Sequence, residues 1–160
     1  MGLDFIVYKK KVNESTSEAW KVPDFEESRE LAYGRKSWEL VYALVPSFEE
    51  TPDEDIPIVK ASWNDLMEKI EPIADKLDAI IEAFDKENYA PEDYTEFIFG
   101  DNEKRLIAEF EYWYNRAFDT RPQLGYDFAA CYIANFWKAN DEVQKVFADP
   151  EWEVWASVSY

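Results

Sequence analysis

A row of acidic side chains between residues 65 and 85 is the feature of this sequence with the clearest chemical meaning. Its members follow one another at intervals of three or four residues: Asp65, Glu68, Glu71, Asp75, Asp78, Glu82 and Asp85. At about 100° per residue, this spacing places all of them on one side of a helix. With a rise of about 1.5 Å per residue, neighbouring carboxylates would stand roughly 5 Å apart along about 30 Å. Phosphates advance about 3.4 Å per nucleotide along a DNA strand, so such a row could occupy a groove that evolved for nucleic acid.

The excess of acid extends along the whole chain. Among 160 residues, Asp and Glu total 35 and Lys and Arg total 17, which leaves a net charge of −18. A small domain needs a net charge of only about 2–8 in magnitude for solubility. A second acidic group lies in the proline-rich segment 46–57: Glu49, Glu50, Asp53, Glu54 and Asp55. We therefore take both groups as candidate partner-binding residues.

The charge also restricts the class of partner. Nucleic acid and anionic membranes both need a cationic surface, so neither is expected to bind directly. A basic protein is the favoured partner. A plainer interpretation stays open, because amphipathic helices normally turn a charged side to water and Asp65–Lys69 and Glu82–Lys86 are ordinary i,i+4 pairs. The acidity would then serve solubility, or adaptation to high salt.

The amino-acid composition lacks several of the residues and motifs on which enzymes commonly depend. The chain has no histidine, which removes the commonest general base, the Ser-His and Cys-His systems and imidazole metal ligation. Its single cysteine, Cys131, lies in an apolar stretch and is expected to be a buried thiol. The four glycines form no phosphate-binding motif. We expect no enzyme, no metal and no cofactor. The alternative, a Mg²⁺-dependent enzyme, would need a tight cluster of carboxylates in a pocket.

Helices are expected to carry most of these residues. Residues 62–87 form an amphipathic segment that begins at a capping box, Ser62–Asp65, and is kinked or divided at Pro72. Further helices are predicted over 26–45, 102–118 and 124–147. The last is apolar on nearly all sides, so it should be the buried central helix.

Two strands are predicted at the ends of the chain. Residues 3–10 are rich in β-formers, and residues 151–160 alternate apolar and polar side chains, so the two segments could pair. Lys9, Lys10 and Lys11 are expected at an exposed strand end. Gly34 indicates close packing of its segment against another element. The whole is predicted to be one α+β domain over 1–160, predominantly helical, with about four helices around the central one and a small sheet.

Several short segments resemble one known family. They are Met1–Lys9, Glu30–Lys36, Phe97–Asp101 and Trp155–Tyr160. Together they are similar to a family of small phage and prophage proteins whose sequences begin MGLDMYL and which carry a Tyr-Trp-Arg-Lys-like motif, where this chain has Gly34 in place of Trp. The resemblance implies a phage or mobile-element origin and an α+β domain, and it implies no functional residues.

Phage origin and strong acidity together point to one class by analogy. Small acidic phage proteins often inhibit host defence nucleases, as anti-CRISPR or anti-restriction proteins, by occupying the site of DNA. We therefore expect a non-enzymatic DNA mimic that binds the basic groove of a CRISPR effector or restriction enzyme. No apolar run approaches the ~18 residues of a membrane span and no signal peptide is evident, so the host bacterial cytoplasm is the expected location. The alternative is a phage accessory protein that binds another partner through an aromatic patch.

Overall fold

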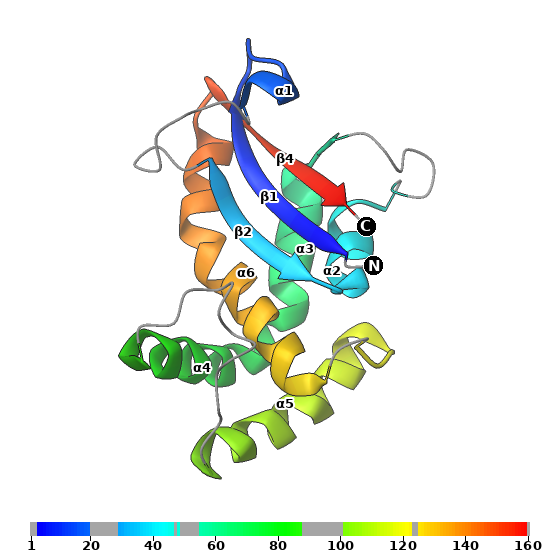
Figure 1. The fold of residues 1–160 in the computed structure, drawn as a ribbon, viewed down its shortest axis with the longest axis vertical. Coiled ribbons are helices and arrows are strands. Elements are labelled where there is room, and N and C mark those ends of the chain that lie inside the picture. The colour runs from blue at the N-terminus through cyan, green and yellow to red at the C-terminus, as the bar shows by residue number, and fades with distance from the viewer. Residues whose placement is uncertain are drawn as a thin grey trace.

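A small antiparallel sheet joins the two ends of the chain. The computed structural model describes residues 3–19, 29–46, 48, 55–87, 101–122 and 125–159. Within these, the strands are β1 (Asp4–Lys11), β2 (Glu30–Arg35), β3 (Ile56–Pro57) and β4 (Trp152–Ser159), in the order β2-β1-β4-β3. β1 pairs with β4 along its full length, from Asp4 opposite Ser159 to Lys11 opposite Trp152. The predicted pairing of the terminal strands is confirmed (Figure 1).

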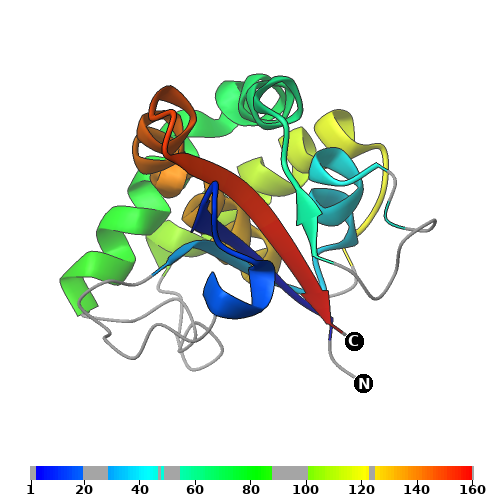
Figure 2. The same cartoon turned by 90° about the horizontal axis from the view of Figure 1, so that it is seen from above.

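Helices make up most of the rest of the described chain. They are α1 (Thr16–Ala19), α2 (Trp38–Leu44), α3 (Lys60–Ile70), the 3-10 helix η3 (Glu71–Ile73), α4 (Ala74–Glu87), α5 (Asp101–Phe118) and α6 (Tyr126–Ala148). Both α3 and α6 pass behind the sheet in Figure 1, on the same face, while α4 and α5 lie beyond its lower end. Figure 2, seen from above, shows the same helical layer on one side of the sheet. The predicted helix-dominated α+β fold is confirmed.

The core centres on α6, as its apolar composition predicted. Side chains on several sides of this helix are buried, including Cys131 and Phe136, which are both 0 % exposed. The ring of Phe136 stacks on Phe5 of β1 at 5.7 Å and on Trp63 of α3 at 6.0 Å. Through these two contacts of one ring, α6 packs against both the sheet and α3.

The predicted helix over 26–45 is wrong in its first part. Residues 26–28 lie outside the described residues. Within 29–45, residues 30–35 form strand β2 and residues 38–44 are helical. The apolar spacing that indicated a helix is overridden by pairing with β1, where Phe5 lies opposite Gly34 and Val7 opposite Ala32. The predicted close packing of Gly34 is confirmed, although on a strand, because a Cβ atom at this position would lie 3.3 Å from Cε2 of Phe136.

Enlarging the side chain at position 34 is therefore expected to destabilise the fold. In Gly34→Val, the added γ-carbons have no space beside Phe136 and Leu40, so we expect a loss of about 1–3 kcal/mol in the free energy of unfolding. Gly34→Ala should cost less, because one methyl group needs only a small displacement and alanine restricts the unfolded chain. Urea unfolding of both variants measures the difference. If Gly34→Val left the protein as stable as the wild type, the close contact between β2 and α6 would be contradicted.

The start of α3 also differs from the prediction. The helix begins at Lys60 with Val59 as its N-cap, and the amide N–H of Trp63 donates to the Val59 carbonyl oxygen. The capping box proposed at Ser62 is therefore wrong. The predicted division at Pro72 is confirmed, because η3 separates α3 from α4 at this residue. Proline lacks an N–H and its ring crowds the preceding turn, so an uninterrupted helix is disfavoured there.

Of the three lysines expected at an exposed strand end, Lys11 is exposed and Lys9 is half-buried, but Lys10 is not exposed. β1 is an inner strand, and the side chain of Lys10 is almost completely buried. Its ammonium group donates to the carbonyl oxygens of Lys11 at 3.0 Å and Glu14 at 2.8 Å, and to Oε1 of Glu153 at 2.9 Å. All three donors of the ammonium are used, which compensates for its loss of water. Lys10 is thus part of the core, a role that its place in a basic triplet did not indicate.

Candidate partner-binding surface

The acidic residues of the predicted row are exposed where the structure describes their side chains. We call the following six the acidic face: Asp65 and Glu68 of α3, Glu71 of η3, and Asp75, Asp78 and Glu82 of α4. The opposite sides of the same helices are buried against the core, which fixes the direction in which the acids point. The backbone of Asp85 belongs to α4, but its side chain is not among those described.

The charge of the acidic face is not balanced by any cation whose side chain the structure describes; the side chain of Lys86, four residues after Glu82, lies outside the described residues. Within the described part of the chain, no lysine or arginine lies within 4.0 Å of any of its carboxylates. The helical pair Asp65–Lys69 predicted as a neutralising contact is therefore not formed at that distance. Lys76 of α4 turns instead to Glu109 of α5, at 3.4 Å. Asp78 accepts a hydrogen bond from Nε1 of Trp137 at 3.0 Å, and the indole is an uncharged donor.

The acidic face is not one straight row. Figure 1 shows α3 and α4 running in different directions on either side of η3, so the length of about 30 Å expected for a continuous helix is not reached along a single line. Glu71 lies at the turn between the two segments. The surface is therefore two shorter acidic segments that meet at an angle.

Of the acidic group in segment 46–57, the structure describes one residue, Asp55. Glu49, Glu50, Asp53 and Glu54 lie outside the described residues. Asp55 is half-buried, and its Oδ2 accepts a hydrogen bond from the hydroxyl of Tyr8 at 2.6 Å. Because Tyr8 belongs to β1, this carboxylate anchors the chain to the sheet next to β3.

An aromatic groove lies beside the acidic face, and the sequence did not indicate it. Its volume is about 440 Å³, and it is lined by Trp38, Glu39, Tyr42 and Ala43 of α2, Lys69 of α3, and Ala117, Phe118 and Thr120 at the end of α5. This volume falls in the range of small-ligand sites, about 300–1,000 Å³. Tyr42 is 44 % exposed, which is high for a large aromatic side chain next to a core. That the protein binds a partner through an aromatic patch stays a prediction, for which this groove is a candidate site.

Comparison with known proteins gives no match. No family model, no curated protein and no solved structure is significantly similar to the chain. The function is therefore argued from the acidic face and the aromatic groove.

Two further properties of the described residues bear on the class of protein. Among the helices that the structure describes, none is both long and apolar enough to cross a membrane. In the same residues, no group of three or more Cys, Asp or Glu side chains is arranged so that it could hold a metal ion. The tight carboxylate cluster that a Mg²⁺-dependent enzyme would need is thus not found in the described part of the chain.

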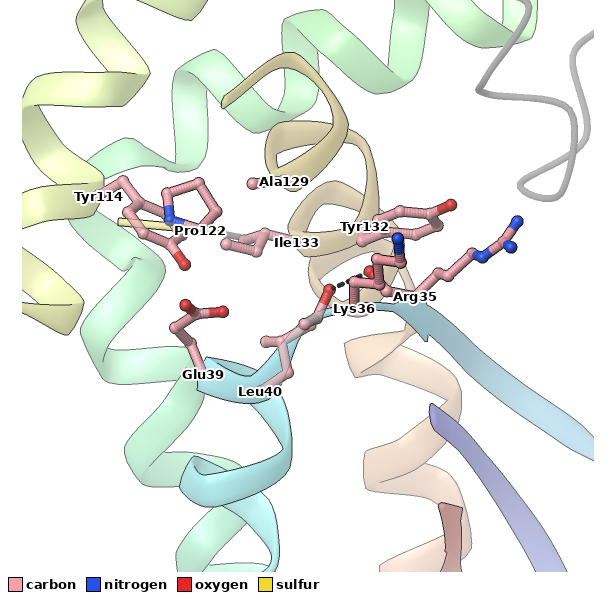
Figure 3. Close-up of a pocket in the computed structure, with 10 residues that line it drawn as sticks. Arg35, Lys36, Glu39, Leu40, Tyr114, Pro122, Ala129, Tyr132 and Ile133 are labelled. Atoms are coloured by element: carbon pink, nitrogen blue, oxygen red, sulfur yellow. Dashed lines mark hydrogen bonds between the residues drawn. The ribbon is translucent and has the colours of Figure 1, made fainter. Parts of the chain in front are cut away.

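A second, much smaller cavity lies between β2, α2 and α6. Figure 3 shows Arg35, Glu39, Tyr114 and Tyr132 around it, with the phenol of Tyr114 directed toward the Glu39 carboxylate. Its open space of about 10 Å³ is enough for roughly one water molecule. Burial, and then the charge of Glu39 and a hydrogen bond to it, raise the pKa of Tyr114 well above its ordinary value. Burial likewise raises the pKa of Tyr132.

These tyrosines predict a loss of stability in alkali. Unfolded tyrosine loses its proton near pH 10, whereas Tyr114 and Tyr132 keep theirs in the folded state. Above about pH 10 the folded state therefore binds more protons than the unfolded state, and the free energy of unfolding falls as the pH rises. Each fully protected tyrosine contributes up to about 1.4 kcal/mol per pH unit. Urea unfolding between about pH 8 and 11 measures the slope. The slope should be shallower in Tyr114→Phe, and an unchanged slope would contradict this assignment.

Proposed function

We propose that this protein is a phage-encoded inhibitor that acts in the bacterial cytoplasm on a host defence nuclease, a CRISPR effector or a restriction enzyme. It binds the basic nucleic-acid groove of the nuclease as a DNA mimic. The observation that carries the proposal is the acidic face: six exposed carboxylates without an ion pair among the described residues, in a chain of net charge −18.

The spacing of the carboxylates supports mimicry of a phosphate backbone. Residues three or four apart on a helix stand about 5–6 Å apart at Cβ, a distance of the same order as the separation of phosphates in a strand. A groove lined with lysine and arginine attracts carboxylates through the same electrostatic interaction with which it attracts phosphates. The turn at η3 means that the groove must follow a bent path, or that α3 or α4 enters it alone.

Electrostatics also predicts the kinetics of such a complex. A charge of −18 approaching a cationic groove raises the association rate at low salt, and the rate falls as salt screens the charges. An inhibitor that competes with abundant DNA for a newly made nuclease benefits from fast association. Catalytic residues are not needed for this activity.

The proposal is tested by adding the purified protein to a panel of purified CRISPR effectors and restriction enzymes. Cleavage of a fluorescent DNA substrate is measured with increasing inhibitor, once before and once after the nuclease has bound DNA. A true mimic inhibits at least one nuclease, and does so more strongly when it is added before the DNA. Inhibition that is equally strong after DNA has bound would instead indicate an effect on the cleavage step.

A second candidate function rests on the aromatic groove. In this alternative the protein is a phage accessory protein that binds a partner through the groove, and the acids serve only solubility. Aromatic anchors in pockets carry much of the binding energy in protein interfaces. The two functions differ in their response to mutation, because this one depends on Trp38 and Tyr42 and is indifferent to substitutions on the acidic face.

A further inference from the structure

We propose that the aromatic groove binds the guanidinium group of an arginine side chain on the basic partner. The inference rests on the proposed function only in taking the partner to be basic. It adds a second, specific contact to the charge-based contact of the acidic face. Three features of the groove carry it: the stacked rings, the carboxylate between them and α5, and the position of the groove next to α3.

The rings form a surface suited to a flat cation. Trp38 and Tyr42 are one helical turn apart on α2 and stack with centroids 5.7 Å apart and planes 24° apart. Trp38 is supported by Phe48, at 5.8 Å, while Phe118 of α5 lines the groove. A guanidinium group is planar and weakly hydrated, and it stacks on aromatic faces more readily than an ammonium group does.

A carboxylate in the same groove supplies the charge. Glu39 follows Trp38 on α2 and lines both the groove and the small cavity behind it. On the cavity side its carboxylate faces the hydroxyl of Tyr114 (Figure 3). A carboxylate has about four acceptor positions, so bonding to Tyr114 leaves capacity for a guanidinium. Aromatic faces next to a carboxylate are the usual surroundings of a bound arginine.

Lys69 gives the proposal its sharpest test. This lysine lines the groove from α3 and would repel a bound arginine. If the occupant were an acidic side chain, Lys69 would attract it and Glu39 would repel it. Removing the charge of Glu39 or of Lys69 therefore has opposite effects on the binding of an arginine and of an acidic side chain. The net charge of −18 favours the arginine.

The groove and the acidic face share helix α3. Lys69, which lines the groove, lies one helical turn after Asp65 of the acidic face, so the same helix borders both surfaces. A partner that covers α3 from the acidic side reaches the groove with one side chain. The acidic face then provides long-range attraction, and the groove provides a position that distinguishes one basic partner from another.

The experiment uses N-acetyl-arginine amide as a probe, with N-acetyl-citrulline amide as its uncharged equivalent. The indole N–H resonance of Trp38 is followed by NMR during titration of the full-length protein. We expect a saturable shift with the arginine probe and none with the citrulline probe. Tyr42→Ala and Glu39→Gln should each weaken binding about fivefold, the effect of losing about 1 kcal/mol, whereas Lys69→Gln should strengthen it. Tyr112→Ala, which removes an exposed tyrosine outside the groove, is the matched control and should have no effect.

Each other result overturns the inference. Equal shifts with both probes would show an apolar contact without charge recognition. Binding of N-acetyl-glutamate amide that is weakened by Lys69→Gln would show that the groove takes an anion. Because the probe carries one charge and needs no nuclease, the result is independent of the proposed function. A groove that binds arginine in a protein that fails to inhibit any nuclease would reject the DNA-mimic proposal alone.

Discussion

Neutralising four carboxylates of the acidic face is expected to weaken binding to the target nuclease by about 30- to 1,000-fold. The substitutions are Glu68→Gln, Glu71→Gln, Asp75→Asn and Glu82→Gln. Each removes a charge without shortening the side chain, and an exposed interfacial charge contributes about 0.5–1 kcal/mol, so the sum is about 2–4 kcal/mol. The dissociation constant is measured by surface plasmon resonance, with the nuclease immobilised, at several salt concentrations. The dependence of affinity on salt should become shallower as well, because fewer charges remain for the salt to screen.

The matched control changes the net charge by the same amount elsewhere. Its substitutions are Glu111→Gln, Asp119→Asn, Asp141→Asn and Glu151→Gln, all at exposed positions on other parts of the fold. If the acidic face is the binding surface, the control weakens binding only slightly, through the reduced long-range field. Equal losses for both variants would show that total charge, and not this surface, determines binding. Circular dichroism and urea unfolding verify that both variants remain folded.

Phe136→Ala is expected to cause a large loss of stability, about 3–5 kcal/mol in the free energy of unfolding. Phe136 is fully buried and stacks on both Phe5 and Trp63, so its removal leaves a cavity where β1, α3 and α6 meet. The surrounding backbone belongs to three different elements and cannot close that space without moving one of them. Urea unfolding monitored by circular dichroism measures the change.

Two further variants make that measurement decisive. Phe136→Leu keeps much of the volume and should lose far less stability than the alanine variant. Asp141→Ala, at an exposed position on the same helix, should change the free energy of unfolding by no more than about 0.5 kcal/mol. A loss below about 1 kcal/mol for Phe136→Ala would mean that the core does not depend on this contact. The acidic face would then lack the rigid support that α3 receives through Trp63.

Features of the fold that depend on local patterns could be predicted from the sequence. The apolar spacing within 62–87 and 102–118 matches α3, α4 and α5, and Pro72 marks the division between two of them. The terminal strands were recognised from β-forming residues and alternation, and their pairing is confirmed. The exposure of the acidic residues follows from the same helical spacing, because burial of one side of a helix leaves the other in water.

Features that depend on distant contacts could not be predicted in this way. Leu31 and Gly34 share a helical spacing with Trp38, and only pairing with β1 makes residues 30–35 a strand. Lys10 is buried because Glu153, 143 residues away in sequence, meets its ammonium group. The direction of α4 relative to α3 depends on packing against α5 and α6, which no local pattern records.

In the candidate site too, the feature that depends on local sequence could be predicted and the feature that depends on distant contacts could not. The acidic row is a property of one stretch of sequence and could be found by its spacing. The aromatic groove combines residues of α2, α3 and α5, and an aromatic residue at helical spacing is usually a core residue. The groove exists because the end of α5 lies near Trp38 and Tyr42 of α2 in the folded chain, and the sequence does not indicate that these elements meet.

The most direct test of DNA mimicry is a competition measurement. The apparent dissociation constant of the protein for its target nuclease is determined at increasing concentrations of the nuclease's own DNA substrate, under conditions that prevent cleavage. Mimicry predicts that the apparent dissociation constant rises in proportion to the DNA concentration, because the acidic face and the DNA occupy the same groove. An apparent dissociation constant that stays constant while the groove fills with DNA would contradict the account.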